Sequence, residues 1–244
     1  MSFHLYSLKS DTIKHQSITD MCVVLDLDAT LIATQDSIDS LKQLEIMTNP
    51  RYIELRRRSY CLKLTDLDNQ DGSRYDFWGI TRPHIEEFLL FCFNYFKYVI
   101  VWSAGKRNYV HAIVKKLFQH LRAPHLILTY DDIVLDKDDN VEKPISKLLK
   151  CDLFINNQIK TNQIYVVDDN ETTFVRNKKN AIYIPPFDPL TTIENMSEPD
   201  TALLQLKYWL LLPHVIHAED ITLLDKSTIF SYPHEDYKAI ADSY

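Results

Sequence analysis

Apolar runs and amphipathic segments alternate along most of the chain. Short runs rich in β-branched residues predict buried strands at residues 22–27, 98–102, 125–130, 163–167 and 181–184. Segments with apolar residues at helical spacing predict helices at residues 83–96, 106–121, 144–149 and 200–212. Strands that alternate with helices indicate an α/β fold with a mainly parallel central sheet and right-handed crossovers.

The region between the first predicted strand and the first long helix departs from this alternation. Residues 35–58 are polar and periodic, which indicates one or two short surface helices. Two further strands are expected at residues 59–67 and 74–82, joined by a turn that uses Asp71 and Gly72. We therefore expect an insertion at about residues 35–80 that contains a β-hairpin. The remaining parts are a polar lead-in at residues 1–19 and a peripheral extension at residues 216–244.

Composition and charge narrow the class of protein. The chain has 244 residues, of which 45% are hydrophobic, and a net charge of −7. A sizeable core is therefore expected, and general nucleic-acid binding, which needs a basic surface, is disfavoured. No apolar segment reaches the roughly 20 residues that cross a bilayer, and no secretory signal opens the chain. We expect a soluble intracellular protein, nuclear or cytoplasmic. The glycine-poor, Ile- and Asn-containing composition suits a viral or an AT-rich genome.

The cysteines give no sign of a metal centre or a disulfide framework. Their spacing along the chain does not match a zinc site, and none forms a Cys-x-x-Cys pair. We expect them to be reduced core thiols, as is usual in an intracellular protein. They are Cys22, Cys61, Cys92 and Cys151.

Polar side chains follow three of the predicted strands at the edge where parallel sheets bind ligands. Asp26 and Asp28 end the first strand, Ser103 follows the second, and Asp168 and Asp169 follow the fourth. Four carboxylates brought together repel one another. A divalent cation with oxygen ligands relieves that repulsion, and Mg²⁺ is the common choice.

A lysine and a hydroxyl complete the parts of a phosphoryl-transfer site. Lys143 supplies a compact positive charge for phosphate oxygens, and Ser103 supplies a hydrogen-bond donor. The chain has neither the Cys-x5-Arg sequence of cysteine phosphatases nor a Gly-x4-Gly-Lys-Ser/Thr loop. An aspartate nucleophile is chemically sound. Taken alone, however, Asp26 and Asp28 fit an exposed acidic turn at least as well.

Six segments in chain order resemble the haloacid dehalogenase (HAD) superfamily. Within it they are most similar to the FCP/SCP-like (NIF-like) branch, phosphatases of the carboxy-terminal domain of RNA polymerase II. The segments are Asp26-x-Asp28-x-Thr30, TRPHIEEFL, VWSAGKRNYV, KPISKL, VVDDNETTF and LLQLKYWLLLPHV. The resemblance covers residues 20–215. It implies a Rossmannoid three-layer sandwich with a small hairpin and helical insertion and without a large cap.

The resemblance also implies roles for individual residues. Asp26 would attack phosphorus, and Asp28 would protonate the leaving oxygen and then activate water. Mg²⁺ would bind the Asp26 carboxylate, the Asp28 main-chain carbonyl and Asp169. Asp168 would orient Lys143 or a metal-bound water.

Further residues are assigned to the phosphate and to the turn between the aspartates. Ser103 and nearby main-chain N–H groups would hold phosphate oxygens, and Thr30 would brace the turn that aims Asp28. The spacing between Lys143 and Asp168 predicts an insertion near residues 151–161. That insertion makes Lys147 a rival for the phosphate lysine, although residues 144–148 match the family better when Lys143 takes that role.

Three arginines precede the predicted hairpin and leave two interpretations open. Arg56, Arg57 and Arg58 form a solvated basic face, or they attract an acidic phosphopeptide.

The predicted function is therefore a Mg²⁺-dependent protein serine/threonine phosphatase that works through an aspartyl phosphate. The expected partner is a phosphorylated protein tail, with the RNA polymerase II carboxy-terminal domain as a candidate. One alternative is a phosphatase of the same superfamily that acts on a small molecule or a nucleic-acid end. Another is a module that binds phosphopeptides without turnover.

Overall fold

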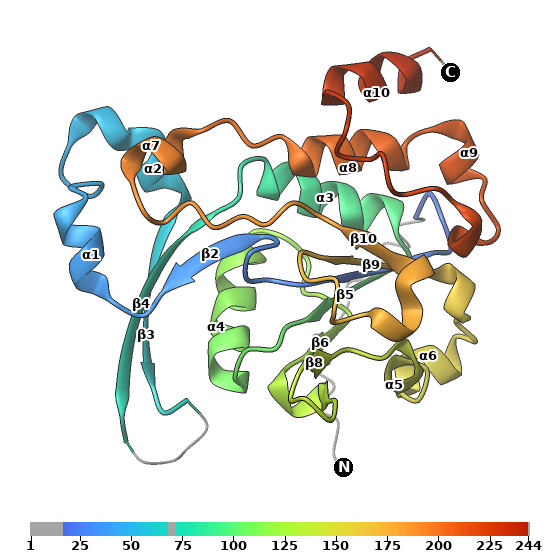
Figure 1. Ribbon diagram of the computed structural model, residues 1–244, viewed down its shortest axis with the longest axis horizontal. Coiled ribbons are helices and arrows are strands. Elements are labelled where there is room, and N and C mark those ends of the chain that lie inside the picture. The colour runs from blue at the N-terminus through green and yellow to red at the C-terminus, as the bar shows by residue number, and fades with distance from the viewer. Residues whose placement is uncertain (1–16, 68–71, 244) are drawn as a thin grey trace.

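A five-stranded parallel sheet forms the centre of the molecule (Figure 1). The computed structural model describes residues 17–67 and 72–243, so most of the predicted lead-in and Asp71 of the predicted turn lie outside the described residues. The strands are β1 (Cys22–Leu25), β5 (Tyr98–Trp102), β6 (Leu126–Leu128), β9 (Ile164–Asp168) and β10 (Ala181–Tyr183), in the order β10-β9-β1-β5-β6. All four strand pairs are parallel. The predicted α/β fold and its five strands are confirmed.

Strand β1 lies in the middle of the sheet and is buried on both faces. Its side chains alternate between two hydrophobic clusters, with Val23 and Leu25 in one and Cys22 and Val24 in the other. This explains why the strand reads as a continuous apolar run, which is typical of a parallel sheet covered on both sides.

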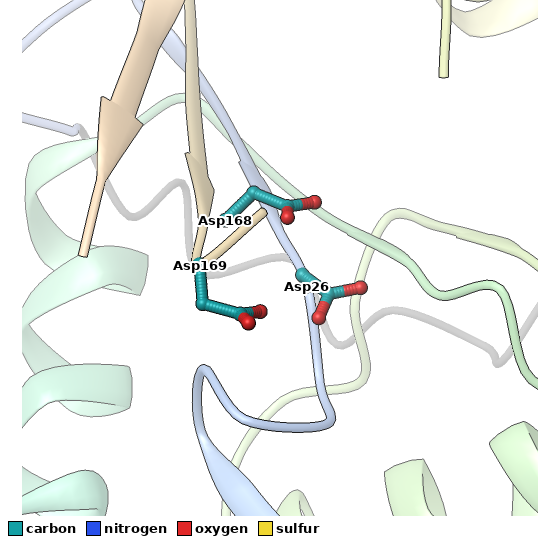
Figure 2. Close-up of side chains that lie close together, drawn as sticks. All are labelled: Asp26, Asp168 and Asp169. Carbon is teal, nitrogen blue, oxygen red and sulfur yellow. The ribbon is translucent and has the colours of Figure 1, made fainter. Parts of the chain in front are cut away.

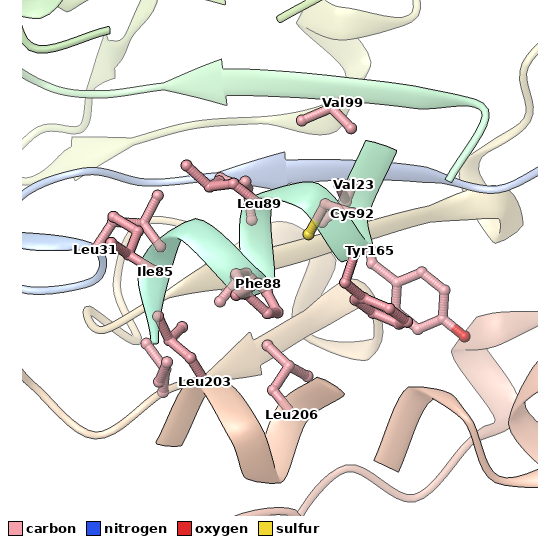
Figure 3. Packing of buried hydrophobic residues seen from close by; sticks show 14 of the residues in the cluster. Val23, Leu31, Ile85, Phe88, Leu89, Cys92, Val99, Tyr165, Leu203 and Leu206 are labelled. Atoms are coloured by element: carbon pink, nitrogen blue, oxygen red, sulfur yellow. The ribbon is translucent and has the colours of Figure 1, made fainter. Parts of the chain in front are cut away.

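Helices cover both faces of the sheet and make the outer layers of the sandwich. One face carries α3 (Ile85–Tyr95), α4 (Arg107–Leu117) and α8 (Ala202–Leu210), and the other carries the short helices α5 (Ile145–Leu148) and α6 (Asp152–Asn156). Figure 3 shows α3 between the sheet and α8, with Leu89 directed toward the strands and Phe88 toward Leu206. Helix α6 occupies the segment where the sequence predicted an insertion.

Helix α3 begins two residues later than its sequence predicted. Pro83 lies in a turn before the helix, because His84 adopts a left-handed conformation with φ 65° that helical backbone does not continue through. Within the helix, Phe91, Phe93 and Phe96 at its end are buried in the core, as expected.

The predicted insertion is a small module beside the main sheet (Figure 1). It contains the antiparallel sheet β2-β4-β3, made of β2 (Ile32–Gln35), β3 (Ser59–Thr65) and β4 (Arg74–Thr81), and the helices α1 (Ile38–Gln43) and α2 (Ile53–Arg58). Trp78 and Ile80 of β4 are fully buried in a separate cluster beneath α1 and α2. The predicted β-hairpin is confirmed, and Gly72 has the expected positive φ of 72°.

The C-terminal residues are less peripheral than the sequence predicted. Ile221, Ile229 and Tyr237 are buried and belong to the larger hydrophobic cluster. Helix α10 (His234–Ala241) packs against α8 (Figure 1). These apolar residues are too widely spaced to form a recognisable pattern, so the docking surface on the core decides their burial.

Short elements connect these parts. They are β7 (Val134–Leu135), β8 (Val141–Glu142), α7 (Ile193–Ser197), α9 (Pro213–Ile216), and the 3₁₀ segments Pro50–Tyr52, Tyr130–Asp132, Thr161–Gln163, Val175–Asn180 and Ile221–Leu223. In the part of the chain that the structure describes, no helix is both long and apolar enough to cross a membrane.

The cysteine prediction holds for three of the four thiols. All four are free, and Cys22, Cys92 and Cys151 are buried. Cys61 is exposed, because the side chains of β3 alternate and Tyr60 takes the inward position next to it.

Candidate active site

The chain turns sharply after β1 and sends its two aspartates in different directions. Asp26 still belongs to the sheet edge, since its N–H donates to the Val167 carbonyl at 3.0 Å. The Leu27 carbonyl then accepts N–H bonds from three following residues, and Ala29 adopts a left-handed φ of 57°. Asp26 contacts Lys143, whereas Asp28 contacts Tyr109. The two carboxylates can therefore do separate tasks.

Three carboxylates converge where β1 and β9 end side by side. Asp26, Asp168 and Asp169 each offer an oxygen atom, and these atoms lie within 4.8 Å of one another (Figure 2). Asp26 and Asp168 are buried, and Asp169 is partly exposed. The sequence predicted that four carboxylates meet, and the structure brings three of them together. The carboxylate of Asp28 does not belong to this group.

Lys143 pairs with two of the three carboxylates, Asp26 and Asp168. Its Nζ atom is 2.5 Å from Asp26 Oδ1 and 2.7 Å from Asp168 Oδ2, and its side chain is only 2% exposed. A main-chain bond from its N–H to the Thr173 carbonyl, 2.6 Å long, fixes the segment that carries it. The rival Lys147 points elsewhere, because its Nζ donates to the Ile133 carbonyl at 3.4 Å.

The cluster carries more negative charge than one lysine balances. Burial raises the pKa of Asp26 to about 8, because the nearby Lys143 only partly offsets the desolvation and Asp168 adds repulsion. Burial and the charge of Asp168 likewise raise the pKa of Asp169. For Lys143, burial disfavours the charged form, but the two aspartates outweigh it and its pKa ends above the usual value.

This surplus of carboxylate oxygens fits a hard divalent cation. Mg²⁺ takes oxygen ligands, often from one or two carboxylates, and keeps open positions for water or a phosphate. Three carboxylates that approach within 4.8 Å and stay partly uncompensated have the right chemistry for such an ion.

Thr30 connects the turn after β1 to the acidic cluster. The Asp169 N–H donates to Thr30 Oγ1 at 3.1 Å, and the same hydroxyl lies 3.2 Å from Asp169 Oδ1. Thr30 is completely buried. Through its hydroxyl Thr30 thus ties the turn after β1 to Asp169, and its role in bracing the turn that aims Asp28 stays a prediction.

Arg82 holds the same turn from the other side. Its Nη1 atom donates to the Thr30 carbonyl at 3.0 Å, Nη2 to the Pro185 carbonyl at 2.8 Å, and Nε to Asp200 at 3.0 Å. Only 1% of its side chain is exposed. Sequence reasoning gave this residue no role, although it stands in the TRPHIEEFL segment that carries the family resemblance.

Asp28 accepts a hydrogen bond from Tyr109. Tyr109 is another residue to which the sequence analysis assigned no role. The Tyr109 hydroxyl lies 2.5 Å from Asp28 Oδ1 and 2.7 Å from Thr34 Oγ1. Burial raises the pKa of Asp28, and the hydrogen bond from Tyr109 partly opposes that shift. Asp28 is therefore a carboxyl group with an increased tendency to hold a proton, as a general acid requires.

A hollow of about 560 Å³ opens beside Asp28. It lies between the β3–β4 hairpin and α4, which contact each other. Its lining residues are Asp28, Thr34, Gln35, Asp36, Leu67, Phe77, Lys106 and Tyr109. The hollow therefore leads from the surface to one of the two aspartates of the first motif.

Ser103 lies at the carboxyl end of β5, the strand next to β1. It is buried, its N–H donates to the Leu128 carbonyl at 3.1 Å, and its Oγ accepts the Gly105 N–H at 3.0 Å. The predicted position at the sheet edge is thus correct.

The predicted basic face has local partners on and near α2. Arg56 donates to the carbonyls of Ile46 and Asn49, and Arg57 pairs with Glu54 at 2.7 Å. Arg58 donates to main-chain carbonyls on β4 and α7. None of these partners belongs to the acidic cluster, so a role in peptide binding stays a prediction.

Comparisons with known proteins agree with this geometry. The model of the NIF family, described as NLI interacting factor-like phosphatase, matches residues 21–222. A CTD phosphatase-like protein of Invertebrate iridescent virus 3, 355R, is 30% identical over 193 residues, which are 76% of this chain and 92% of the viral protein.

Solved structures of an RNA polymerase II CTD phosphatase share the fold. Fission yeast Fcp1 bound to beryllium fluoride matches with a TM-score of 0.57 at 17% identity, over 92% of this chain and 63% of the Fcp1 chain. A second Fcp1 structure matches with a TM-score of 0.57 at 18% identity and the same coverage. This chain therefore spans less than two thirds of the Fcp1 chain, and at these identities the likeness is one of fold.

Proposed function

The chain belongs to the NLI interacting factor-like phosphatase family of the HAD superfamily, and we propose that it hydrolyses phosphoserine and phosphothreonine in a protein tail through an aspartyl phosphate. The observation that carries this proposal is the division of labour between two aspartates. Asp26 contacts Lys143 within the acidic cluster, and Asp28 faces the adjoining hollow.

In the proposed first step, a carboxylate oxygen of Asp26 attacks phosphorus. The bond between phosphorus and the serine or threonine oxygen breaks, and Asp28 gives its proton to that oxygen. The ammonium of Lys143 and the hydroxyl of Ser103 offset the charge of the phosphate oxygens. In the second step Asp28 takes a proton from water, whose oxygen attacks phosphorus and frees Asp26.

The proposed cofactor is Mg²⁺, held by the carboxylates of Asp26 and Asp169 and by the main-chain carbonyl of Asp28, with Asp168 fixing Lys143 beside them. When bound, the ion supplies positive charge next to the phosphate oxygens.

The proposed substrate class rests on the hollow and on the relatives. The hollow is open to the surface and combines apolar side chains, Leu67 and Phe77, with polar ones, which suits an extended peptide. The viral relative is named for its likeness to CTD phosphatases, and Fcp1 acts on the CTD of RNA polymerase II. We therefore propose a phosphorylated protein tail as the partner, with that domain as the first candidate.

The experiment measures phosphate release by the wild type and by Asp26→Asn from phosphoserine and phosphothreonine peptides, with and without Mg²⁺. We expect Asp26→Asn to lose at least about 10³-fold in turnover. The matched control is Asp39→Asn, because Asp39 is an exposed carboxylate that pairs with Lys42 on α1. Retained activity in Asp26→Asn would contradict the proposed nucleophile.

A panel of other phosphate esters tests the substrate class. Sugar phosphates and 5′-phosphorylated oligonucleotides are compared with the phosphopeptides at equal concentration. Faster turnover of either class would replace the peptide by a small molecule or a nucleic-acid end. Phosphopeptide affinity without phosphate release would indicate a binding module.

A further inference from the structure

A chain of three hydroxyl groups ends on the carboxylate of Asp28. The Tyr60 hydroxyl lies 2.6 Å from Thr34 Oγ1, which lies 2.7 Å from the Tyr109 hydroxyl. The Tyr109 hydroxyl in turn lies 2.5 Å from Asp28 Oδ1. The proposed chemistry at Asp26 and Lys143 uses none of these three hydroxyls.

The ionised form of Asp28 decides which of these hydroxyl groups donates and which accepts. Each hydroxyl has a single hydrogen, and an ionised carboxylate can only accept. The single hydrogen of Tyr109 therefore goes to Asp28 in preference to Thr34. The Thr34 hydroxyl also lowers the pKa of Asp28 through a hydrogen bond, and it can accept from Tyr60. The alternative acceptor for Tyr60 is the Ala33 carbonyl, which at 3.5 Å is the longest contact of the set.

Packing keeps these groups in place. Tyr60 comes from β3, Thr34 from β2 and Tyr109 from α4, so the three hydroxyl groups come from three separate elements. The rings of Tyr60 and Tyr109 are buried, and the Tyr109 ring packs against Phe77 with centroids 5.4 Å apart. A hydroxyl on a ring held in this way has little freedom to leave its acceptor.

We propose that Tyr109 is a positioning residue for the acid and base steps, fixed in turn by Thr34 and Tyr60. By occupying Asp28 Oδ1, it leaves Oδ2 as the oxygen that gives a proton to the departing serine or threonine and later takes one from water. The same arrangement, in which a third group orients an acid or base, recurs in many active sites. The inference rests on the proposed role of Asp28.

The leaving group separates this role from a structural one. Departure of a serine oxygen needs a proton, whereas nitrophenolate leaves p-nitrophenyl phosphate as an anion. The parameter kcat/KM includes only steps up to transfer of phosphorus to Asp26, so it reports protonation of the leaving group without the later hydrolysis. A misplaced Asp28 carboxyl therefore slows the phosphoserine peptide more than the aryl phosphate.

The test compares kcat/KM for a phosphoserine peptide and for p-nitrophenyl phosphate in the wild type, Tyr109→Phe and Thr34→Val. We expect Tyr109→Phe to lower the peptide value by about 10-fold or more and the aryl value by less than about 3-fold. Thr34→Val removes the hydroxyl that contacts both tyrosines, and it should change the ratio in the same direction by a smaller factor.

Tyr95→Phe is the matched control. It removes the hydroxyl of another buried tyrosine. That hydroxyl donates to the Leu210 carbonyl at 2.7 Å. We expect its ratio of the two kcat/KM values to equal that of the wild type. Circular dichroism and thermal melting of each variant show that it is folded.

Three results would overturn the inference in distinguishable ways. An unchanged ratio in Tyr109→Phe, beside an active wild type, removes the positioning role and leaves the proposed phosphatase intact. An equal fall in kcat/KM for both substrates would mean that the three hydroxyl groups have a structural role and do not position Asp28. No phosphate release by the wild type from either substrate overturns the proposed function and this inference together.

Discussion

Lys143 and Asp26 form a buried ion pair, with Nζ 2.5 Å from Oδ1 and side chains that are 2% and 10% exposed. The residues are 117 positions apart in the sequence. Since the ammonium also contacts Asp168, one cation joins the ends of β1 and β9 to the segment before α5.

Replacing Lys143 by Met removes that cation and leaves two buried carboxylates facing each other. We expect Lys143→Met to lower kcat by about 10²–10³-fold and the free energy of unfolding by about 3–5 kcal/mol. Phosphate release and urea denaturation measure the two effects. Lys147→Met is the control, because the Lys147 ammonium donates to the Ile133 carbonyl and, among the described residues, not to the acidic cluster. The opposite outcome, with Lys147→Met the inactive variant, would reverse the assignment of the phosphate lysine.

Removal of divalent cations should abolish activity and lower the melting temperature. A cation that neutralises the acidic cluster only in the folded chain would, at about 100 times its Kd, add about 2.7 kcal/mol to the free energy of unfolding. We expect excess chelator to stop phosphate release and added Mg²⁺ to restore it. Differential scanning calorimetry with increasing Mg²⁺ should show a rising melting temperature in the wild type and a much weaker rise in Asp169→Asn. Full activity in excess chelator would exclude the metal.

In metal-free buffer, Asp26→Asn should make the protein more stable, and the gain should grow with pH. The pKa of Asp26 is raised to about 8 in the folded chain and is about 3.9 in an unfolded one. Between these values the folded chain binds more protons, so the contribution of Asp26 to stability is full below pH 4 and is lost as pH rises to 8. Asparagine has no such dependence. Urea midpoints at pH 5, 6, 7 and 8 measure the difference.

The control for the pH series is Asp39→Asn. Its partner Lys42 lowers the pKa of Asp39, chiefly through a hydrogen bond, so this carboxyl stays ionised across the whole range. The difference between Asp39→Asn and the wild type should therefore be flat from pH 5 to 8. An equally flat difference for Asp26→Asn would show that burial does not raise the pKa of Asp26 as proposed.

Arg82 should matter to stability more than any exposed arginine. Arg82→Met leaves Asp200 and the carbonyls of Thr30 and Pro185 without their donor. Because Asp200 is 21% exposed, we expect a loss near the lower end for a broken buried pair, about 3 kcal/mol. Arg82→Lys should recover only part of this loss, since a compact ammonium lacks the planar, widely spaced N–H donors with which the guanidinium reaches all three partners.

Arg57→Met is the matched variant for stability. Arg57 pairs with Glu54 on the surface, and both side chains are more than two-thirds exposed. Pairs of this kind contribute little to stability, so the urea midpoint should stay close to that of the wild type. The same variant tests the predicted basic face, because a higher KM for acidic phosphopeptides would assign Arg57 to substrate binding.

The sheet and its acidic edge could be predicted because both are local patterns. The strands β1, β5 and β9 are short apolar runs. Each is followed at once by a polar residue or ends on one, so the parallel order alone brings Asp26, Ser103 and Asp168 to one edge. Where the pattern was weaker, only the predicted bounds of an element were wrong. Helix α3, for example, begins after His84 and not at Pro83.

The contacts that select among similar side chains could not be predicted. Lys147 lies in α5 and Lys143 precedes that helix, and only the path of the chain before α5 decides which ammonium meets Asp26. Tyr109 reads as part of the buried face of an amphipathic helix, and its hydroxyl reaches Asp28 through the packing of α4 against the hairpin. Such contacts depend on tertiary packing, which the periodicity of the sequence does not predict.

The burial of Ile229 and Tyr237 extends the cooperative folding unit beyond residue 222, where the match to the family model ends. A fragment truncated there would expose the surface of α8 that α10 covers. Limited proteolysis should therefore spare this tail while the protein stays native, and recombinant fragments should retain it to remain monodisperse.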